Sequence, residues 1–120
     1  MTKKILVVED EVDILRMLEF ILKKKDFEVV STTDGPEALE AFLQSKPDLV
    51  ILDWLLPSAN GTEVSRWMRE KSNLRHVPII LLTATAEDVE KKAKECMANS
   101  YFLKPFDYEL LLKEIERLIG

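Results

Sequence analysis

Residues 49–57 read Leu49-Val50-Ile51-Leu52-Asp53-Trp54-Leu55-Leu56-Pro57, and this stretch decides the fold. Its four leading aliphatic residues form a continuous apolar run, which is typical of a strand buried on both faces of a parallel sheet. The run ends in a carboxylate, Asp53. In open parallel α/β sheets, ligands bind beyond the carboxyl ends of the strands, so Asp53 stands where a functional site is expected. A turn former or a helix cap is the alternative role for a single Asp.

Three further apolar runs end in polar residues in the same way. Residues 5–8 are followed by Glu9-Asp10-Glu11, residues 77–82 by Thr83, and residues 100–103 by Lys104. Residues 27–32 alternate between apolar and polar side chains and are rich in strand formers, which predicts a more exposed edge strand. The sequence therefore predicts five strands.

Between these strands, and after the last one, apolar residues recur at helical spacing. Helices are expected over residues 12–25, 36–45, from about 62, 86–97 and 107–119. Five strands that alternate with five helices require a parallel sheet with helices on both faces, joined by right-handed crossovers. The predicted fold is a doubly wound α/β (βα)5 flavodoxin-like three-layer sandwich with sheet order 2-1-3-4-5, whose crevice lies between the first and third strands.

The turn before the third helix contains Asn60 and Gly61, which both tolerate a positive φ. An Asn-Gly pair can also mark a β-hairpin. The helical spacing of Val64, Trp67 and Met68 argues against a hairpin here. We therefore expect a turn at Asn60 and Gly61, followed by a helix that begins near Thr62.

The composition is that of one globular domain over residues 1–120, with 47% hydrophobic and 32% charged residues. A net charge of −5 gives little attraction for a phosphate backbone, so no direct nucleic-acid binding is expected. The chain has a single cysteine, which fits a reducing compartment. We find neither a signal peptide nor an apolar run near the ~20 residues of a membrane helix. A soluble cytoplasmic domain without membrane contact is expected.

The predicted topology gathers five polar residues at one edge of the sheet: Glu9, Asp10, Asp53, Thr83 and Lys104. Two unit charges 4 Å apart repel by roughly 4 kcal/mol at a surface-like effective dielectric, so three crowded carboxylates favour a divalent cation. Oxygen ligands of this kind select Mg²⁺. The alternative is an acidic rim that binds nothing tightly, but it would not explain why Thr83 and Lys104 lie at the same edge.

The hydroxyl and the ammonium complete a candidate site for phosphoryl transfer. A carboxylate can act as a nucleophile and become an acyl phosphate. The reaction otherwise needs positioning and charge neutralisation, which Mg²⁺, Lys104 and Thr83 can each supply to one phosphoryl oxygen. Asp53 is the candidate nucleophile because it ends the middle strand.

The chain resembles a response regulator receiver domain of two-component signalling over its whole length. Four motifs in order carry the resemblance: residues 5–11, Leu52-Asp53-x-x-x-Pro57-x-x-Asn60-Gly61, Leu82-Thr83-Ala84 and residues 101–106. The resemblance implies that Asp53 accepts a phosphoryl group from a phosphohistidine on a sensor histidine kinase or a histidine phosphotransfer protein. The domain would catalyse its own phosphorylation and dephosphorylation without being a turnover enzyme.

The resemblance also implies roles for the other site residues. Glu9, Asp10, Asp53 and the backbone carbonyl of Leu55 would hold Mg²⁺, and Lys104 would pair with the phosphoryl group. The Lys104–Pro105 bond would be cis. Thr83 and Tyr101 would form a switch pair that alters the face made by the fourth helix, the fifth strand and the fifth helix. That face would act on an output domain or target protein, and a homodimer through the fourth and fifth helices stays open.

The sequence departs from the family at Met97-Ala98-Asn99-Ser100, where receivers usually have Gly-Ala-Asp-Asp. If the family's Gly supplies a left-handed helix cap, that conformation falls either on Met97, with strain, or on Asn99, which tolerates it. The residues beside the site, Trp54, Leu55 and Thr85, can shape water access to an acyl phosphate.

Other functions on related folds fit less well. An FMN binder needs a phosphate loop rich in hydroxyl groups and glycine after the first strand, where this chain has three acids. Gly35, Gly61 and Gly120 are the only glycines, so there is no Walker A loop. A dehalogenase-type phosphatase needs a second Asp where Leu55 stands. The remaining alternative is a phosphorylation-independent interaction module on the same scaffold.

Overall fold

The carboxyl ends of five parallel strands form one edge of the sheet and carry the site. The computed structural model describes residues 2–70 and 76–120, so residues 1 and 71–75 of the predicted domain lie outside the described part. The strands lie side by side in the order β2-β1-β3-β6-β7, which confirms the predicted order. Their bounds are Glu28–Thr32 (β2), Lys4–Val8 (β1), Leu49–Asp53 (β3), Ile79–Thr83 (β6) and Ser100–Leu103 (β7).

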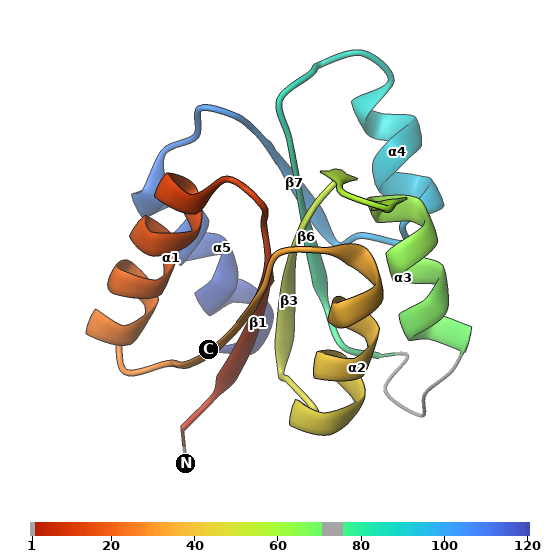
Figure 1. Ribbon diagram of the computed structural model, residues 1–120. Helices are drawn as coiled ribbons and strands as arrows, with labels where there is room; N and C mark the ends of the chain where they lie inside the picture. The colour runs from red at the N-terminus through yellow and green to blue at the C-terminus, as the bar shows by residue number, and fades with distance from the viewer. Residues whose placement is uncertain (1, 71–75) are drawn as a thin grey trace.

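Helices cover both faces of the sheet, as predicted (Figure 1). Helices α1 (Val12–Lys24) and α5 (Tyr108–Ile119) lie on one side, and α2 (Gly35–Ser45), α3 (Gly61–Glu70) and α4 (Val89–Glu95) on the other. Within the described residues, none of the helices combines the length and the apolarity that crossing a bilayer requires.

The apolar strands feed two separate core layers because successive side chains point to opposite faces. In β3, Val50 and Leu52 join the layer under α2 and α3, whereas Leu49 and Ile51 join the layer under α1 and α5. Each fully buried aliphatic side chain contributes roughly 1.5–3 kcal/mol by leaving water. Every residue of β3 is buried, so the strand that ends in Asp53 is fixed from both sides.

The turn after β3 differs from the prediction. Residues Leu55–Leu56 (β4) and Ala59–Asn60 (β5) form a short antiparallel pair, and Ser58 between them takes the positive φ, of 68°. Asn60 and Gly61 tolerate a positive φ but do not adopt one, and the helix expected near Thr62 begins at Gly61. Asn60 instead caps α3, since its Oδ1 accepts a hydrogen bond from the Glu63 backbone N–H at 2.9 Å.

Gly61 is needed for a close approach of two backbones. Its N–H donates to the Trp54 carbonyl at 2.6 Å, and a Cβ at this position would lie 3.0 Å from the Trp54 Cα. The contact anchors the start of α3 to the residue that follows Asp53.

Helix α4 is shorter than the predicted 86–97 because a left-handed residue stands at each end. Asp88 has φ 52° and Met97 has φ 54°. The left-handed cap residue, which is usually Gly in receivers, is therefore Met97 in this chain. Asn99 has another role, since its Oδ1 accepts from the Ile79 N–H at 3.0 Å and its own N–H donates to the Ile79 carbonyl at 2.8 Å.

We expect Met97→Gly to raise the free energy of unfolding by about 1 kcal/mol, because an L-residue in the left-handed region is strained and glycine is not. The Met97 side chain is 62% exposed, so little packing is lost. Urea unfolding measures the change. Met97→Ala is the control: it keeps a Cβ and should not gain, and an equal gain in both variants would contradict this account.

Candidate functional site

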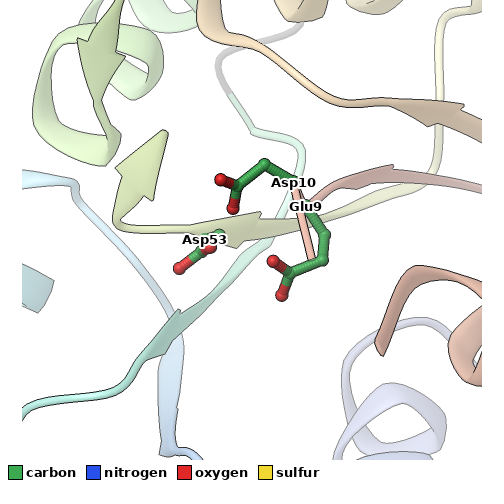
Figure 2. A group of neighbouring side chains, drawn as sticks. All are labelled: Glu9, Asp10 and Asp53. Carbon is green, nitrogen blue, oxygen red and sulfur yellow. The ribbon is translucent and has the colours of Figure 1, made fainter. Parts of the chain in front are cut away.

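The sheet register places the ends of β1 and β3 next to each other. Val8 pairs with Leu52, so Glu9 and Asp10 follow β1 at the level where Asp53 ends β3 (Figure 2). One carboxylate oxygen from each of these three residues lies within 4.8 Å of the other two. Glu9 and Asp53 are buried, and Asp10 is exposed.

Lys104 reaches this group from the end of β7. Its Nζ lies 2.8 Å from Glu9 Oε1, 3.1 Å from Asp53 Oδ2 and 3.2 Å from Glu11 Oε1. Only 8% of the Lys104 side chain is exposed. A buried ammonium is therefore in direct contact with two buried carboxylates, which offsets part of the cost of burying their charges.

The electrostatics of Asp53 and Lys104 differ from those of free side chains. Burial raises the pKa of Asp53 to about 7, with the hydrogen bond and the charge of Glu9 adding to the rise and Lys104 opposing it. Burial alone would lower the pKa of Lys104, but its hydrogen bonds and ion pairs with Glu9 and Asp53 outweigh that effect and raise it. Lys104 stays charged at neutral pH, while Asp53 binds a proton far more readily than an ordinary Asp.

Glu9 is held on both sides of its carboxylate. Its Oε2 accepts a hydrogen bond from the Glu11 backbone N–H at 3.0 Å, while Oε1 contacts Lys104. Three converging carboxylates of this kind match the all-oxygen donor set that a hard divalent cation prefers. Glu9, Asp10 and Asp53 together could hold Mg²⁺.

The other predicted site residues lie nearby but are not all joined to this group. Thr83 is buried at the end of β6, and its hydroxyl faces the Thr85 backbone, 3.3 Å from the N–H and 3.4 Å from the carbonyl. Leu55 is 71% exposed and lines the same cavity of about 320 Å³ as Asp53 and Lys104. Tyr101 is 39% exposed on the edge strand β7. The Lys104–Pro105 bond is cis, as the resemblance implies.

Two neighbours of the site have contacts that the sequence analysis missed. Glu11 belongs to the three-acid block, but only its position directly after Asp10 hinted at a contact with Lys104. Trp54 lies under α4, where Lys92 Nζ is 4.3 Å from the ring centroid. The Trp54 Nε1–H donates to the Thr62 hydroxyl at 3.4 Å. Trp54, the residue directly after Asp53, thus contacts both α3 and α4.

Comparisons with known proteins agree with this geometry. Residues 5–116 match the family described as the response regulator receiver domain. The phosphate regulon transcriptional regulatory protein PhoB of Escherichia coli (strain K12) is 33% identical over 99% of this chain and 52% of its own length. The chain thus spans about half the length of the curated relatives it matches.

Two solved structures are similar along their whole length. The response regulator TrrA of Thermotoga maritima, in complex with Mg²⁺ and BeF, has a TM-score of 0.86 and 34% identity, covering 98% of this chain and 99% of that one. The receiver domain of a sensor histidine kinase from Pseudomonas aeruginosa, with a magnesium ion coordinated in its active site cleft, has a TM-score of 0.86 and 30% identity, covering 100% and 99%. The chain therefore belongs to the response regulator receiver domains of two-component signal transduction.

Proposed function

We propose that this domain accepts a phosphoryl group on Asp53 from a phosphohistidine of a sensor histidine kinase or a histidine phosphotransfer protein. The observation that carries the proposal is the contact of Lys104 Nζ with Asp53 Oδ2 at 3.1 Å, inside a cluster that also contains Glu9 and Asp10. A nucleophilic carboxylate, an ammonium and further acidic oxygens at one place are the parts that acyl phosphate chemistry requires.

In the transfer step, an oxygen of the Asp53 carboxylate forms a bond to phosphorus while the P–N bond to the donor imidazole breaks. The electron pair of that bond returns to the imidazole nitrogen. Lys104 stabilises the negative charge on the phosphoryl oxygens because its ammonium is buried and already oriented. The product is an aspartyl phosphate on β3.

Magnesium is the proposed cofactor, held by Glu9, Asp10, Asp53 and the Leu55 carbonyl. The ion would neutralise charge on the carboxylates and on the transferred phosphoryl group. The similar receiver domains of Thermotoga maritima and Pseudomonas aeruginosa were each solved with magnesium. That likeness and the donor set support Mg²⁺ at this position.

The proposed readout runs through Thr83 and Tyr101. The Thr83 hydroxyl would leave the Thr85 backbone to reach the phosphoryl group, and Tyr101 would turn inward into the vacated space. This change would bias the α4, β7 and α5 surface between two states. The short span of α4 between two left-handed residues supports a local element that can shift.

The domain would be a self-modifying switch rather than a turnover enzyme, working in the cytoplasm on an output domain or target protein. Formation of a homodimer through α4 and α5 would be one form of output. The other candidate, an interaction module that works without phosphorylation, is separated by the test below.

The test is the intact mass of the protein after incubation with acetyl phosphate. We expect an adduct of about 80 Da, the mass of a phosphoryl group on an acyl phosphate, in the parent protein with Mg²⁺. The adduct should be missing when the metal is chelated, and in Asp53→Ala with Mg²⁺. An unmodified parent protein would favour the interaction module, and an adduct that survives in Asp53→Ala would place the reaction elsewhere.

A further inference from the structure

Lys104 has a third carboxylate partner beyond the two in the buried site. An ammonium has three N–H donors, and Glu9, Asp53 and Glu11 lie at 2.8, 3.1 and 3.2 Å from Lys104 Nζ. Lys104 donates hydrogen bonds to Asp53 and Glu11, and Glu9 adds an ion pair, so carboxylates surround the ammonium before any phosphoryl group arrives. A phosphoryl group on Asp53 therefore competes with the Glu11 carboxylate for Lys104.

Glu11 is the partner that Lys104 can release most easily. The Glu9 carboxylate is fully buried and also accepts from a backbone N–H, and Asp53 is the proposed nucleophile itself. The Glu11 side chain is 57% exposed. Exposed ion pairs are weak because water competes for both charges, so this contact is the least costly of the three to break.

The position of the Glu11 side chain is not explained by the helix that it precedes. Glu11 is the N-cap residue of α1, a position where the short side chains of Ser, Thr, Asp and Asn accept from the first backbone N–H groups. Its side chain makes no such cap hydrogen bond. The carboxylate extends instead to Lys104 and lines the cavity that also contains Asp10, Asp53 and Leu55.

We propose that Glu11 is a gating residue that restrains phosphorylation by small donors, an inference that rests on the proposed function. With acetyl phosphate, an Asp53 oxygen forms a bond to phosphorus, the bond from phosphorus to the acetate oxygen breaks, and acetate leaves with the electron pair. The phosphoryl group then accepts the Lys104 N–H that Glu11 held. Glu11 acts through Lys104 and is a positioning residue.

Gating of this kind discriminates between donor classes. A small acyl phosphate has few contacts with which to offset the loss of the Glu11–Lys104 ion pair. A protein that carries a phosphohistidine gains binding energy from the rest of its surface, which can be used for rearrangements at the reacting centre. Glu11 therefore favours protein donors over free acyl phosphates.

The experiment measures the rate of Asp53 adduct formation with acetyl phosphate and Mg²⁺ in four proteins: the parent, Glu11→Gln, Glu11→Asp and Asp13→Asn. Glu11→Asp keeps the charge but is one methylene shorter, so it loses reach toward Lys104. Asp13→Asn is the matched control, because Asp13 is an exposed acid of α1 that does not line the cavity. We expect both Glu11 variants to react about two- to fivefold faster, as expected for losing one exposed ion pair.

The gain should persist at saturating acetyl phosphate, because it comes from freeing Lys104 during the transfer and not from easier binding. Asp13→Asn should match the parent. The proposal is overturned if Glu11→Gln reacts no faster than the parent. It is also overturned if Glu11→Asp stays at the parent rate while Asp13→Asn and Glu11→Gln gain equally, since net charge alone would then be responsible. A parent protein without any adduct would instead remove the proposed function and this inference with it.

Discussion

Replacing Lys104 with Met should lower the free energy of unfolding of the metal-free domain by about 3 kcal/mol, because removing one partner of a buried ion pair leaves an uncompensated charge behind. Here two buried carboxylates, Glu9 and Asp53, lose the ammonium at 2.8 and 3.1 Å. For a domain of this size the change corresponds to a fall in Tm of about 10 °C. Thermal unfolding in the presence of a chelator measures it.

Magnesium should reverse much of this loss. With the ammonium removed, a divalent cation would neutralise the same carboxylates, so saturating Mg²⁺ should raise the Tm of Lys104→Met more than that of the parent. Lys91→Met, which alters an exposed lysine of α4, is the control and should change little. A Lys104→Met protein as stable as the parent without metal would show that the ion pairs contribute no net stability.

Replacing Asp53 with Asn should instead raise the free energy of unfolding of the metal-free domain. The pKa of Asp53 is raised from 3.8 to about 7, mainly by burial and then by Glu9. Between these two values the folded state binds more protons than the unfolded state, so the stability of the parent falls as pH rises through this window. Asparagine lacks the charge and avoids that loss. We expect Asp53→Asn to be about 2–4 kcal/mol more stable than the parent at pH values above about 7 without metal.

The pH dependence is the sharper part of this prediction. Near pH 4 the parent carboxyl is protonated in the fold, so the advantage of Asp53→Asn should fade there. Urea unfolding at both pH values, with chelator, gives the comparison. Asp13→Asn serves as the control and should stay within about 0.5 kcal/mol of the parent. An Asp53→Asn protein that is less stable than the parent at neutral pH would mean that the buried charge is fully compensated.

The fold was predictable because its strands carry strong patterns. The apolar runs that end in Glu9, Asp53 and Thr83 are typical of strands buried on both faces, and the run before Lys104 forms the edge strand β7. The alternation of strands with helices leaves few arrangements. The ends of α4 were not predictable in the same way. Met97 was one of two candidate cap positions at its C-terminal end, but nothing in the sequence marks Asp88 as left-handed at its N-terminal end. The β4–β5 pair was not predicted for a similar reason, because the residue with a positive φ is Ser58 and not Asn60 or Gly61.

The sequence predicts which residues lie close together at the site, but not which of their atoms are in contact. Strand ends fix which residues share an edge, and the structure brings Glu9, Asp10, Asp53 and Lys104 together there. Side-chain directions depend on local rotamers and on competing partners, and the spacing of residues in the sequence does not predict either. The Thr83 hydroxyl faces the Thr85 backbone for this reason, and the contact of Glu11 with Lys104 came only from the structure.

The ion pairs around Lys104 join distant parts of the chain, since Asp53 lies 51 positions before it and Glu11 lies 93 positions before it. Contacts of such long sequence separation form late, after local helices and hairpins. During synthesis on the ribosome, a nascent chain that has not yet exposed Lys104 already contains Asp53 but lacks its ammonium partner. The complete set of contacts around Asp53 therefore forms only after the whole stretch from β1 to Lys104 has been synthesised.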